Sequence, residues 1–244
     1  MKVVHERNLN VNSTWTDINC EMGLMPSLQV VQDNMCEFFR LIGSDGITMI
    51  PVCNAFLVLT KTRIHFENFI KWLDEFVAIS EVSAMSRIKV CLDAILKDKN
   101  NNILATCSQE LCAMDNDTRK IRFLETTLVP TDLEVTKSKS LDFAKMSFEM
   151  SDEDLVDTID IKVVNLDFYK HTNNLEYVRM MMSLLDLKFL EDNIITDFEI
   201  HYISESRFGD KLSLYKRVED NKILFEIKRE DKVVTKAILE FIAR

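Results

Sequence analysis

Apolar and polar residues follow one another along this chain in an order that predicts one helix followed by several strands, and the order occurs twice. In the first half, apolar residues recur at helical spacing from Leu28 to Leu41, with Pro26 at the helix start and Gly43 after its end. After a loop around Pro51, four runs rich in β-branched residues predict strands. These strands are expected over residues 55–66, 75–83, 88–97 and 103–113, and residues 1–14 are expected to contain a short edge strand.

The second half repeats the order of the first. A strand is expected over residues 158–166 and a helix over residues 174–187. The strands that follow are expected over residues 195–204, 212–218, 223–229 and 233–243. One helix followed by consecutive strands is typical of an α+β unit, in which an antiparallel sheet packs on the helix.

The two halves are similar enough to suggest an internal duplication. A slide of 147 positions sets Leu28 on Leu175 and matches the apolar faces of the two predicted helices. In that alignment Cys20 falls opposite Asp167, so the first half lacks the reactive groups and we expect any catalysis in the second half. We therefore predict two units, at residues 1–130 and 156–244, joined by a connection at residues 131–155.

Composition and charge narrow the range of functions. An apolar share of 47% is ample for a packed core, and four glycines leave no glycine-rich phosphate loop. A net charge of −10 argues against a nucleic-acid partner, because phosphates require a basic surface. The chain has neither an apolar run of membrane-spanning length nor a signal segment at its start. Six cysteines without a C-x-x-C pair favour small buried thiols over a disulfide framework or a metal site, so we expect a cytoplasmic protein.

The densest polar stretch lies where the second-half strand is expected to give way to its helix. It contains Asp167, Tyr169, His171, Asn173 and Asn174. The two asparagines are natural helix N-caps, and an acyl group placed beside them would meet free N–H donors at the positive end of the helix dipole. Histidine changes its charge near neutral pH, so His171 can orient a polar group or transfer a proton.

These residues also resemble a family motif. The motif D-x-N-x-H-x-N-N-x-x-Y of the acyl-acyl-carrier-protein thioesterases is similar to the stretch from Asp167 to Tyr177. The family places a catalytic glutamate about one hairpin later, and Glu205 follows His171 by 34 residues. Tyr169 stands where the family has an asparagine. The motif with its glutamate is fairly specific, whereas the resemblance along the rest of the chain is weak.

The resemblance implies an α+β fold of two tandem hotdog units, each an antiparallel sheet wrapped on a central helix. It also implies hydrolysis of fatty acyl-acyl-carrier-protein thioesters to a free fatty acid and the carrier thiol, without a metal or an organic cofactor. The acyl chain would bind in the first unit and catalysis would lie in the second. The implied partner is an acyl carrier protein, and a homodimer is left open.

The resemblance also assigns roles to the candidate residues. We expect Glu205 to act as general base on water, with Asp167 and His171 orienting the thioester and the helix N–H groups near the two asparagines holding the oxyanion. Each residue alone has a structural interpretation, as a turn aspartate, a hydrogen-bonding histidine and a surface glutamate. Their joint spacing favours catalysis. The hydroxyl of Tyr169 could replace the family amide, or its ring could face elsewhere.

Two alternative functions remain. The chain could be a hotdog thioesterase that acts on coenzyme A thioesters, or a catalytically weak protein that binds acyl thioesters, an interpretation that Tyr169 keeps open. A group of basic residues in the first half is a candidate docking face for an acidic carrier protein, with a solvated strand face as the alternative. The group comprises Lys61, Arg63, Arg87, Lys89, Arg119, Lys120 and Arg122.

Overall fold

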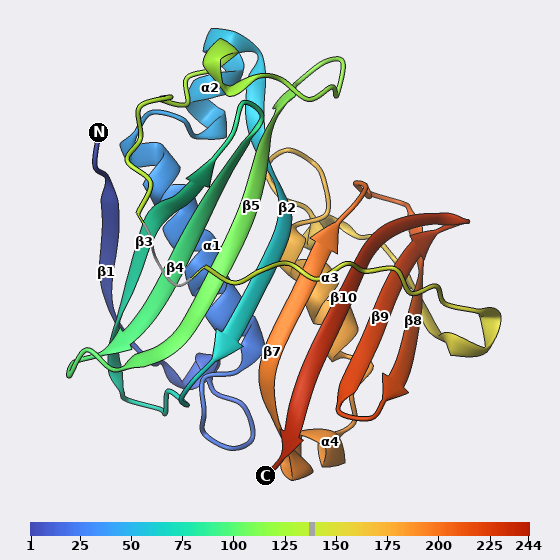
Figure 1. Ribbon diagram of the computed structural model, residues 1–244. Coiled ribbons are helices and arrows are strands. Elements are labelled where there is room, and N and C mark those ends of the chain that lie inside the picture. The colour runs from blue at the N-terminus through green and yellow to red at the C-terminus, as the bar shows by residue number, and fades with distance from the viewer. Residues whose placement is uncertain (137–139) are drawn as a thin grey trace. The chain divides into compact units, whose positions relative to one another are not determined.

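The computed structural model describes residues 1–136 and 140–244 (Figure 1). The chain divides into two compact units, Met1–Asp142 and Phe143–Arg244. The boundary between them falls within the stretch that the sequence suggests as a connection, and residues 137–139 of that stretch lie outside the described residues.

The first unit pairs its strands in one antiparallel sheet in the order β1-β3-β4-β5-β2 (Figure 1). Its long helix α1 packs against β1, β3 and β4. The elements are β1 (Val4–Asn10), α1 (Leu24–Leu41), α2 (Gly46–Cys53), β2 (Ala55–Phe66), β3 (Glu75–Met85), β4 (Lys89–Asp98) and β5 (Ile103–Asp115), with 3-10 turns at Ser13–Trp15 and Leu124–Thr126.

Helix α1 forms where the helical spacing predicts it. Leu28, Val31 and Phe38 lie on one face and are buried, so the apolar stripe of the sequence is the face that packs on the sheet. Gly43 follows the helix with φ of +68°, and its N–H donates to the carbonyl of Arg40 at 3.1 Å. Glycine adopts this left-handed conformation without a steric penalty, which ends the helix there.

The second unit also pairs its strands in an antiparallel sheet, in the order β7-β10-β9-β8-β6 (Figure 1). Its helix α3 packs against β8. The elements are β6 (Leu155–Asp160), α3 (Asn174–Met182), α4 (Leu187–Asp192), β7 (Asn193–Tyr202), β8 (Lys211–Glu219), β9 (Lys222–Arg229) and β10 (Lys232–Ala243), with 3-10 turns at Asp152–Asp154 and Val163–Asn165.

Most strand predictions are confirmed to within two residues at each end, but the strand expected over residues 158–166 is wrong in its second part. Strand β6 ends at Asp160, and Val163–Asn165 forms a 3-10 turn. Val163 and Val164 are 70% and 84% exposed. Their β-branched side chains therefore mark an exposed apolar turn and not a buried strand.

The helix expected over residues 174–187 is also wrong in its length. Helix α3 ends at Met182, and a separate helix α4 starts at Leu187. Asp186 is the N-cap of α4, where its Oδ1 accepts a hydrogen bond from the N–H of Phe189 at 2.7 Å. A side chain that caps a new helix competes with continuation of the old one, which explains the break.

The loop expected around Pro51 is a short helix instead. Asp45 caps the N-terminus of α2, and its Oδ1 accepts from the N–H of Thr48 at 3.0 Å. Pro51 removes one backbone donor from this helix. The helix ends two residues later at Cys53, so few further hydrogen bonds depend on the missing donor.

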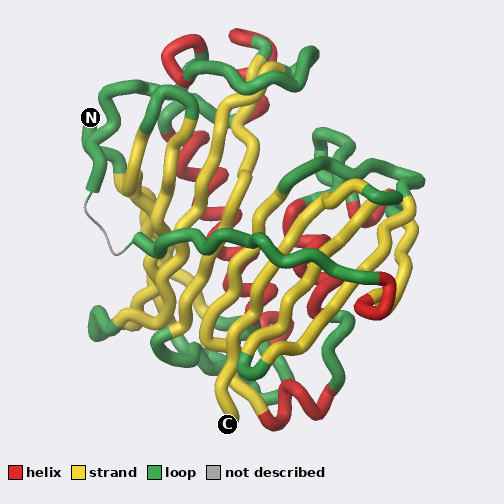
Figure 2. Tube along the Cα trace, turned by 45° about the vertical axis from the view of Figure 1, so that its right-hand side comes forward, coloured by secondary structure: helices red, strands yellow, loops and turns green. Residues whose placement is uncertain are grey.

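The segment that joins the two units runs along the sheet surface of each unit. In the first unit, the hydroxyl of Ser140 donates to Asp93 Oδ2 at 2.6 Å. In the second unit, the N–H of Ala144 donates to Glu199 Oε1 at 2.8 Å. Asp93 and Glu199 are both buried. In each unit this segment crosses the sheet face that carries no helix (Figure 2).

Candidate active site

A tight turn leads into α3 and carries most of the candidate residues. Leu166 and Thr172 form an isolated β-bridge, and the N–H of Asp167 donates to the carbonyl of His171 at 2.8 Å. The carboxylate oxygen Oδ1 of Asp167 accepts from the N–H groups of Tyr169 at 2.9 Å and His171 at 3.1 Å. The carboxylate of Asp167 therefore organises the backbone of the turn.

A second segment, which follows β7, brings Glu205 to the turn. His171 and Arg207 form a β-bridge, and the N–H of Thr172 donates to the carbonyl of Ser206 at 2.9 Å. This pairing places His171 Nε2 at 3.3 Å from Glu205 Oε2, while Arg207 Nη2 lies 3.8 Å from the same oxygen. The His171 side chain is 15% exposed and the Glu205 side chain 32% exposed. The pair is thus partly shielded but remains accessible to a substrate.

Three buried hydroxyl groups join the two segments that carry this pair. Ser206 Oγ is 2.7 Å from Thr172 Oγ1 and 2.8 Å from the Tyr177 hydroxyl oxygen, which also accepts from the Ser206 N–H at 3.1 Å. Burial raises the pKa of Tyr177, so its phenol stays protonated at neutral pH. We refer to Thr172, Tyr177 and Ser206 as the hydroxyl cluster. It ties the segment that carries Glu205 to the first turns of α3.

The other side of the Glu205 segment is held by a partly exposed ion pair. Asp210 Oδ2 accepts from the N–H of Arg207 at 2.8 Å and from Arg229 Nη1 at 2.7 Å. Burial opposes the ionisation of Asp210, but the hydrogen bonds from Arg229 and from the Arg207 backbone outweigh it and lower the pKa of this carboxyl. Sequence reasoning missed Asp210, Thr172 and Ser206, because their roles depend on contacts between residues 19 to 34 positions apart.

The two asparagines have different roles. Asn173 is the N-cap of α3, and its Oδ1 accepts from the N–H of Leu175 at 3.0 Å. Asn174 is the first residue of α3 and is half-buried, and its side chain has no hydrogen-bond partner among the described residues. The Asn173 side-chain oxygen is therefore used by the fold, whereas the Asn174 amide is available to a substrate.

The ring of Tyr169 faces its neighbour in sequence. The rings of Phe168 and Tyr169 have centroids 4.0 Å apart, and Phe168 is 71% exposed. The backbone N–H of Tyr169 donates to Asp167. The aromatic ring therefore forms part of the rim of the turn.

The first unit contains the same turn, which corrects the alignment of the two halves. Asp17 Oδ1 accepts from the N–H groups of Asn19 at 2.8 Å and Glu21 at 3.3 Å, as Asp167 does in the second unit. Cys20 has φ of +59° and the corresponding Lys170 has φ of +64°. The repeat is therefore 150 positions and not 147, because Asp17 matches Asp167. A shift of three residues is almost one helical turn, so helix faces alone could not distinguish the two alignments.

The corrected alignment also shows what distinguishes the second unit. Glu21 occupies the place of His171 and bridges Lys71 as His171 bridges Arg207. The Met22 N–H donates to the carbonyl of Ile70, as Thr172 does to Ser206. Phe69 therefore stands where the second unit has Glu205. A turn aspartate occurs in both units, whereas the histidine–glutamate pair occurs only in the second.

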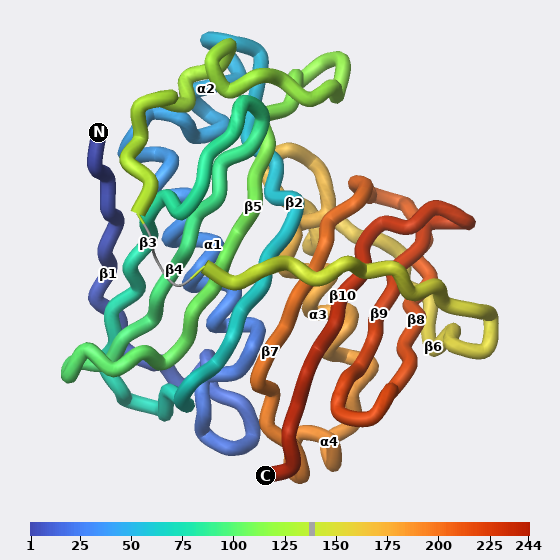
Figure 3. Tube along the Cα trace, in the orientation of Figure 1, coloured from blue at the N-terminus to red at the C-terminus, as the bar shows by residue number. Residues whose placement is uncertain are grey.

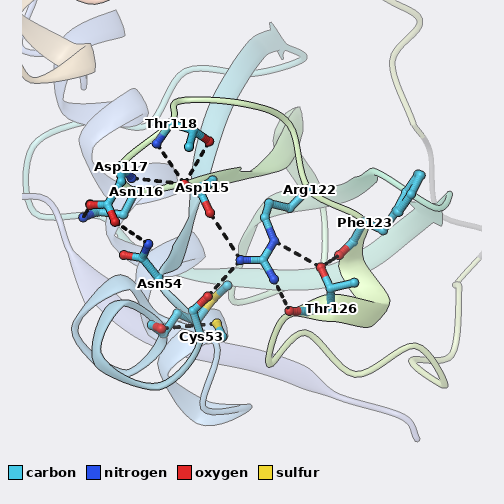
Figure 4. Close-up of polar contacts among 10 residues, drawn as sticks. Cys53, Asn54, Asp115, Asn116, Asp117, Thr118, Arg122, Phe123 and Thr126 are labelled. Atoms are coloured by element: carbon cyan, nitrogen blue, oxygen red, sulfur yellow. Dashed lines mark hydrogen bonds and ion pairs between the residues drawn. The ribbon is translucent and has the colours of Figure 1, made fainter.

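The basic residues considered as a docking face are largely engaged within the first unit. Arg122 donates through Nη1 to the carbonyl of Cys53 and through Nη2 to the carbonyl of Thr126, both at 2.9 Å, and Nη1 lies 3.5 Å from Asp115 Oδ2 (Figure 4). Arg122 therefore fastens the end of β5 to α2. Lys61, Arg63, Arg87 and Lys89 also pair with Glu110, Asp142 or Glu125.

Two other kinds of feature are missing from the part of the chain that the structure describes. No group of three or more His, Cys, Asp or Glu side chains is arranged there to hold a metal ion. None of its helices combines the length and the apolar character needed to cross a membrane.

Models of known protein families match both units of the chain. The model of the acyl-ACP thioesterase N-terminal domain matches residues 2–130, and the model of the acyl-ACP thioesterase C-terminal domain matches residues 148–243. The chain belongs to the acyl-ACP thioesterase family. It is accordingly a thioester hydrolase that acts on acyl-ACP, as the motif around His171 predicts.

Solved structures of acyl-ACP thioesterases have the same fold. An acyl-ACP thioesterase from Bacteroides thetaiotaomicron is 18% identical, covers 98% of this chain and 98% of its own, and has a TM-score of 0.88. A 12:0-ACP thioesterase from Umbellularia californica is 17% identical, covers 99% of this chain and 98% of its own, and also has a TM-score of 0.88. The predicted α+β fold of two tandem hotdog units is confirmed. No sequence among the curated proteins matches the chain.

Proposed function

We propose that this acyl-ACP thioesterase hydrolyses its fatty acyl substrate at the His171–Glu205 pair, with Glu205 as the general base. The observation that carries the proposal is the 3.3 Å distance between His171 Nε2 and Glu205 Oε2 at the N-terminus of α3. The matching turn of the first unit has Glu21 and Phe69 at these places, so it offers no comparable pair.

The proposed reaction follows from this geometry. Glu205 removes a proton from a water molecule as the water oxygen attacks the thioester carbonyl carbon. The side-chain amide of Asn174 and the positive end of the α3 dipole stabilise the oxyanion that develops. The tetrahedral intermediate then collapses with cleavage of the carbon–sulfur bond. The proton held by Glu205 and His171 passes to the leaving thiolate, and the products are a carboxylic acid and the carrier thiol.

Asp167 has a positioning role in this proposal. Its carboxylate oxygen accepts two backbone hydrogen bonds that shape the turn, and Asp17 does the same in the first unit, where Phe69 replaces the base. Tyr169 contributes its ring to the rim beside Phe168. The bound thioester would therefore meet an aromatic rim, the histidine–glutamate pair and the Asn174 amide.

The surface around the site supports a protein-linked substrate. Val164, Phe168 and Phe208 are 84%, 71% and 65% exposed, an unusual concentration of apolar surface on two neighbouring loops. Lys170 and Arg207 are exposed on the same loops. An apolar surface with basic residues at its edge is complementary to an acidic carrier protein, although the chain as a whole has a net charge of −10.

We also infer that the protein acts in the cytoplasm, which its cysteine spacing favours, and that it has no nucleic-acid partner, because of its negative charge. A homodimer stays a prediction.

The substrate is tested by measuring thiol release from matched acyl-ACP and acyl-coenzyme A thioesters with the full chain. We expect the wild type to have a higher kcat/KM for the carrier-linked thioester than for the coenzyme A thioester. This advantage should be smaller when Phe168 and Phe208 are both replaced by serine. Equal turnover of both thioesters would favour the coenzyme A alternative. Binding of both thioesters without turnover would favour a protein that binds but does not hydrolyse them.

A further inference from the structure

The helix-facing surface of the first unit's sheet contains two polar side chains without partners. Gln109 on β5 and Thr62 on β2 stand directly opposite each other in the strand register. They are 2% and 3% exposed. Gln109 Oε1 and Thr62 Oγ1 are buried atoms with no hydrogen-bond partner among the described residues. Buried polar atoms in native proteins normally have a partner, and two such atoms on opposed residues could be satisfied together by one polar group from outside the chain.

The strand register shows which face of the sheet these side chains occupy. Asn34 of α1 donates to Ser80 Oγ on β3 at 2.7 Å, so Ser80 faces the helix. Its register partner is Ala94, followed by Cys107 and then Ile64 across the sheet. Residues opposite each other share a face.

Side chains two positions apart in a strand also share a face, so Gln109 and Thr62 lie on the helix side with Cys107 and Ile64. Ser108 lies on the opposite side, where its hydroxyl contacts Asp93 and accepts from the N–H of Leu141, both at 2.8 Å.

The surroundings of the pair are apolar. Leu92, Leu111 and Ile64 lie on the same side of the sheet and are at most 2% exposed. Helix α1 packs on β1, β3 and β4, so β5 and β2, which carry the pair, lie beyond its main contacts (Figure 3). The pair is therefore a buried polar spot with apolar side chains beside it on the helix side of the sheet.

We propose that Thr62 and Gln109 bind a hydroxyl group on the acyl chain, so that the enzyme selects hydroxylated fatty acyl thioesters. The inference rests on the proposed function for its substrate class. A buried fatty chain matches the apolar surface, and a hydroxyl group on it both donates and accepts a hydrogen bond. Glutamine offers an acceptor and a donor, and threonine offers a hydroxyl, so together they satisfy such a group fully. A site built to bond a hydroxyl discriminates strongly against the analogue that lacks it.

The test compares carrier-linked acyl chains of one length, either plain or with a hydroxyl group at successive positions. We expect the wild type to favour one hydroxylated chain in kcat/KM by about tenfold, the value of one buried hydrogen bond. The double variant Thr62→Val, Gln109→Met should lose this preference. Thr106→Val is the matched control, because Thr106 is also buried and its Oγ1 also lacks a partner, but it lies on the opposite face of β5.

Several results would overturn the inference. One is a wild type that favours the plain chain at every position of the hydroxyl group. Another is a double variant that is more stable than the wild type but has unchanged selectivity, which would assign the pair to an internal water molecule.

If no thioester is hydrolysed, thermal shifts with free fatty acids decide the question separately from the proposed function. A hydroxylated acid that raises the Tm of the wild type, and not that of the double variant, supports the inference. Equal shifts of the two proteins refute it.

Discussion

Replacing Tyr177 with phenylalanine removes one oxygen atom from the hydroxyl cluster that holds the Glu205 segment. That oxygen accepts from the Ser206 N–H at 3.1 Å and lies 2.8 Å from Ser206 Oγ. Ser206 is fully buried and Tyr177 is 3% exposed, so water cannot replace the lost contacts without opening the structure. An orphaned buried donor costs about 1–3 kcal/mol, and we expect Tyr177→Phe to lower the free energy of unfolding by that amount.

The same substitution should lower activity through the position of Glu205. Ser206 is its neighbour in the chain, and a displacement of about 1 Å at a catalytic group can reduce the rate about a hundredfold. We expect kcat to fall by about tenfold to a hundredfold, with KM unchanged, at a temperature well below the Tm of the variant.

Tyr215→Phe is the matched control, because Tyr215 is also buried in the second unit and its hydroxyl has no hydrogen bond within the described part of the chain. The measurements are urea unfolding and steady-state kinetics with acyl-ACP. Equal effects of the two substitutions would refute the role of the hydroxyl cluster.

Two further predictions concern charged groups of the second unit. Because the pKa of Asp210 is lowered in the folded protein, its stabilising contribution is present above the unfolded pKa of about 3.9 and is lost as the pH falls through the folded value. Asp210→Asn should therefore be less stable than the wild type at pH 7, by roughly 1 kcal/mol, and in urea unfolding the difference should shrink as the pH falls below about 4. A difference that does not vary with pH would contradict this. Glu226 is 1% exposed and forms ion pairs with Lys228 at 2.9 Å and Lys236 at 3.0 Å. Glu226→Gln should cost about 3–5 kcal/mol, because two shielded ammonium groups lose their counter-charge. Glu240→Gln, which breaks the more exposed pair with Lys222, should cost at most about 1 kcal/mol, and similar losses in both variants would show that burial does not matter here.

Much of the fold could be predicted because local periodicity and packing agree. The apolar stripe of α1 and the β-branched runs of the strands reflect faces that are buried in the structure. The errors occur where this agreement fails. Val163 and Val164 are apolar but exposed, so they imitate a buried strand. Asp186 starts a new helix where apolar spacing alone suggests that the old one continues.

The candidate site could be predicted only in part. The spacing within the motif located the turn, and its match to a family linked it to a distant glutamate. The contact between His171 and Glu205 depends on a β-bridge between two loops, which no local pattern encodes. The alignment of the halves by helix faces also missed Asp17, because a slip of three residues preserves those faces. The shared turn became visible only in the backbone hydrogen bonds.

The central claim is that the base is Glu205 and that Asp167 shapes the turn. It is tested most directly by measuring kcat on acyl-ACP for Glu205→Gln and Asp167→Asn, together with the Tm of each variant. The account predicts that Glu205→Gln lowers kcat by about 10²–10⁴ with an unchanged Tm, and that Asp167→Asn lowers the Tm and has the smaller effect on kcat. A Glu205→Gln enzyme with near-wild-type kcat, beside a stable Asp167→Asn variant that is inactive, would contradict it and assign the base to Asp167.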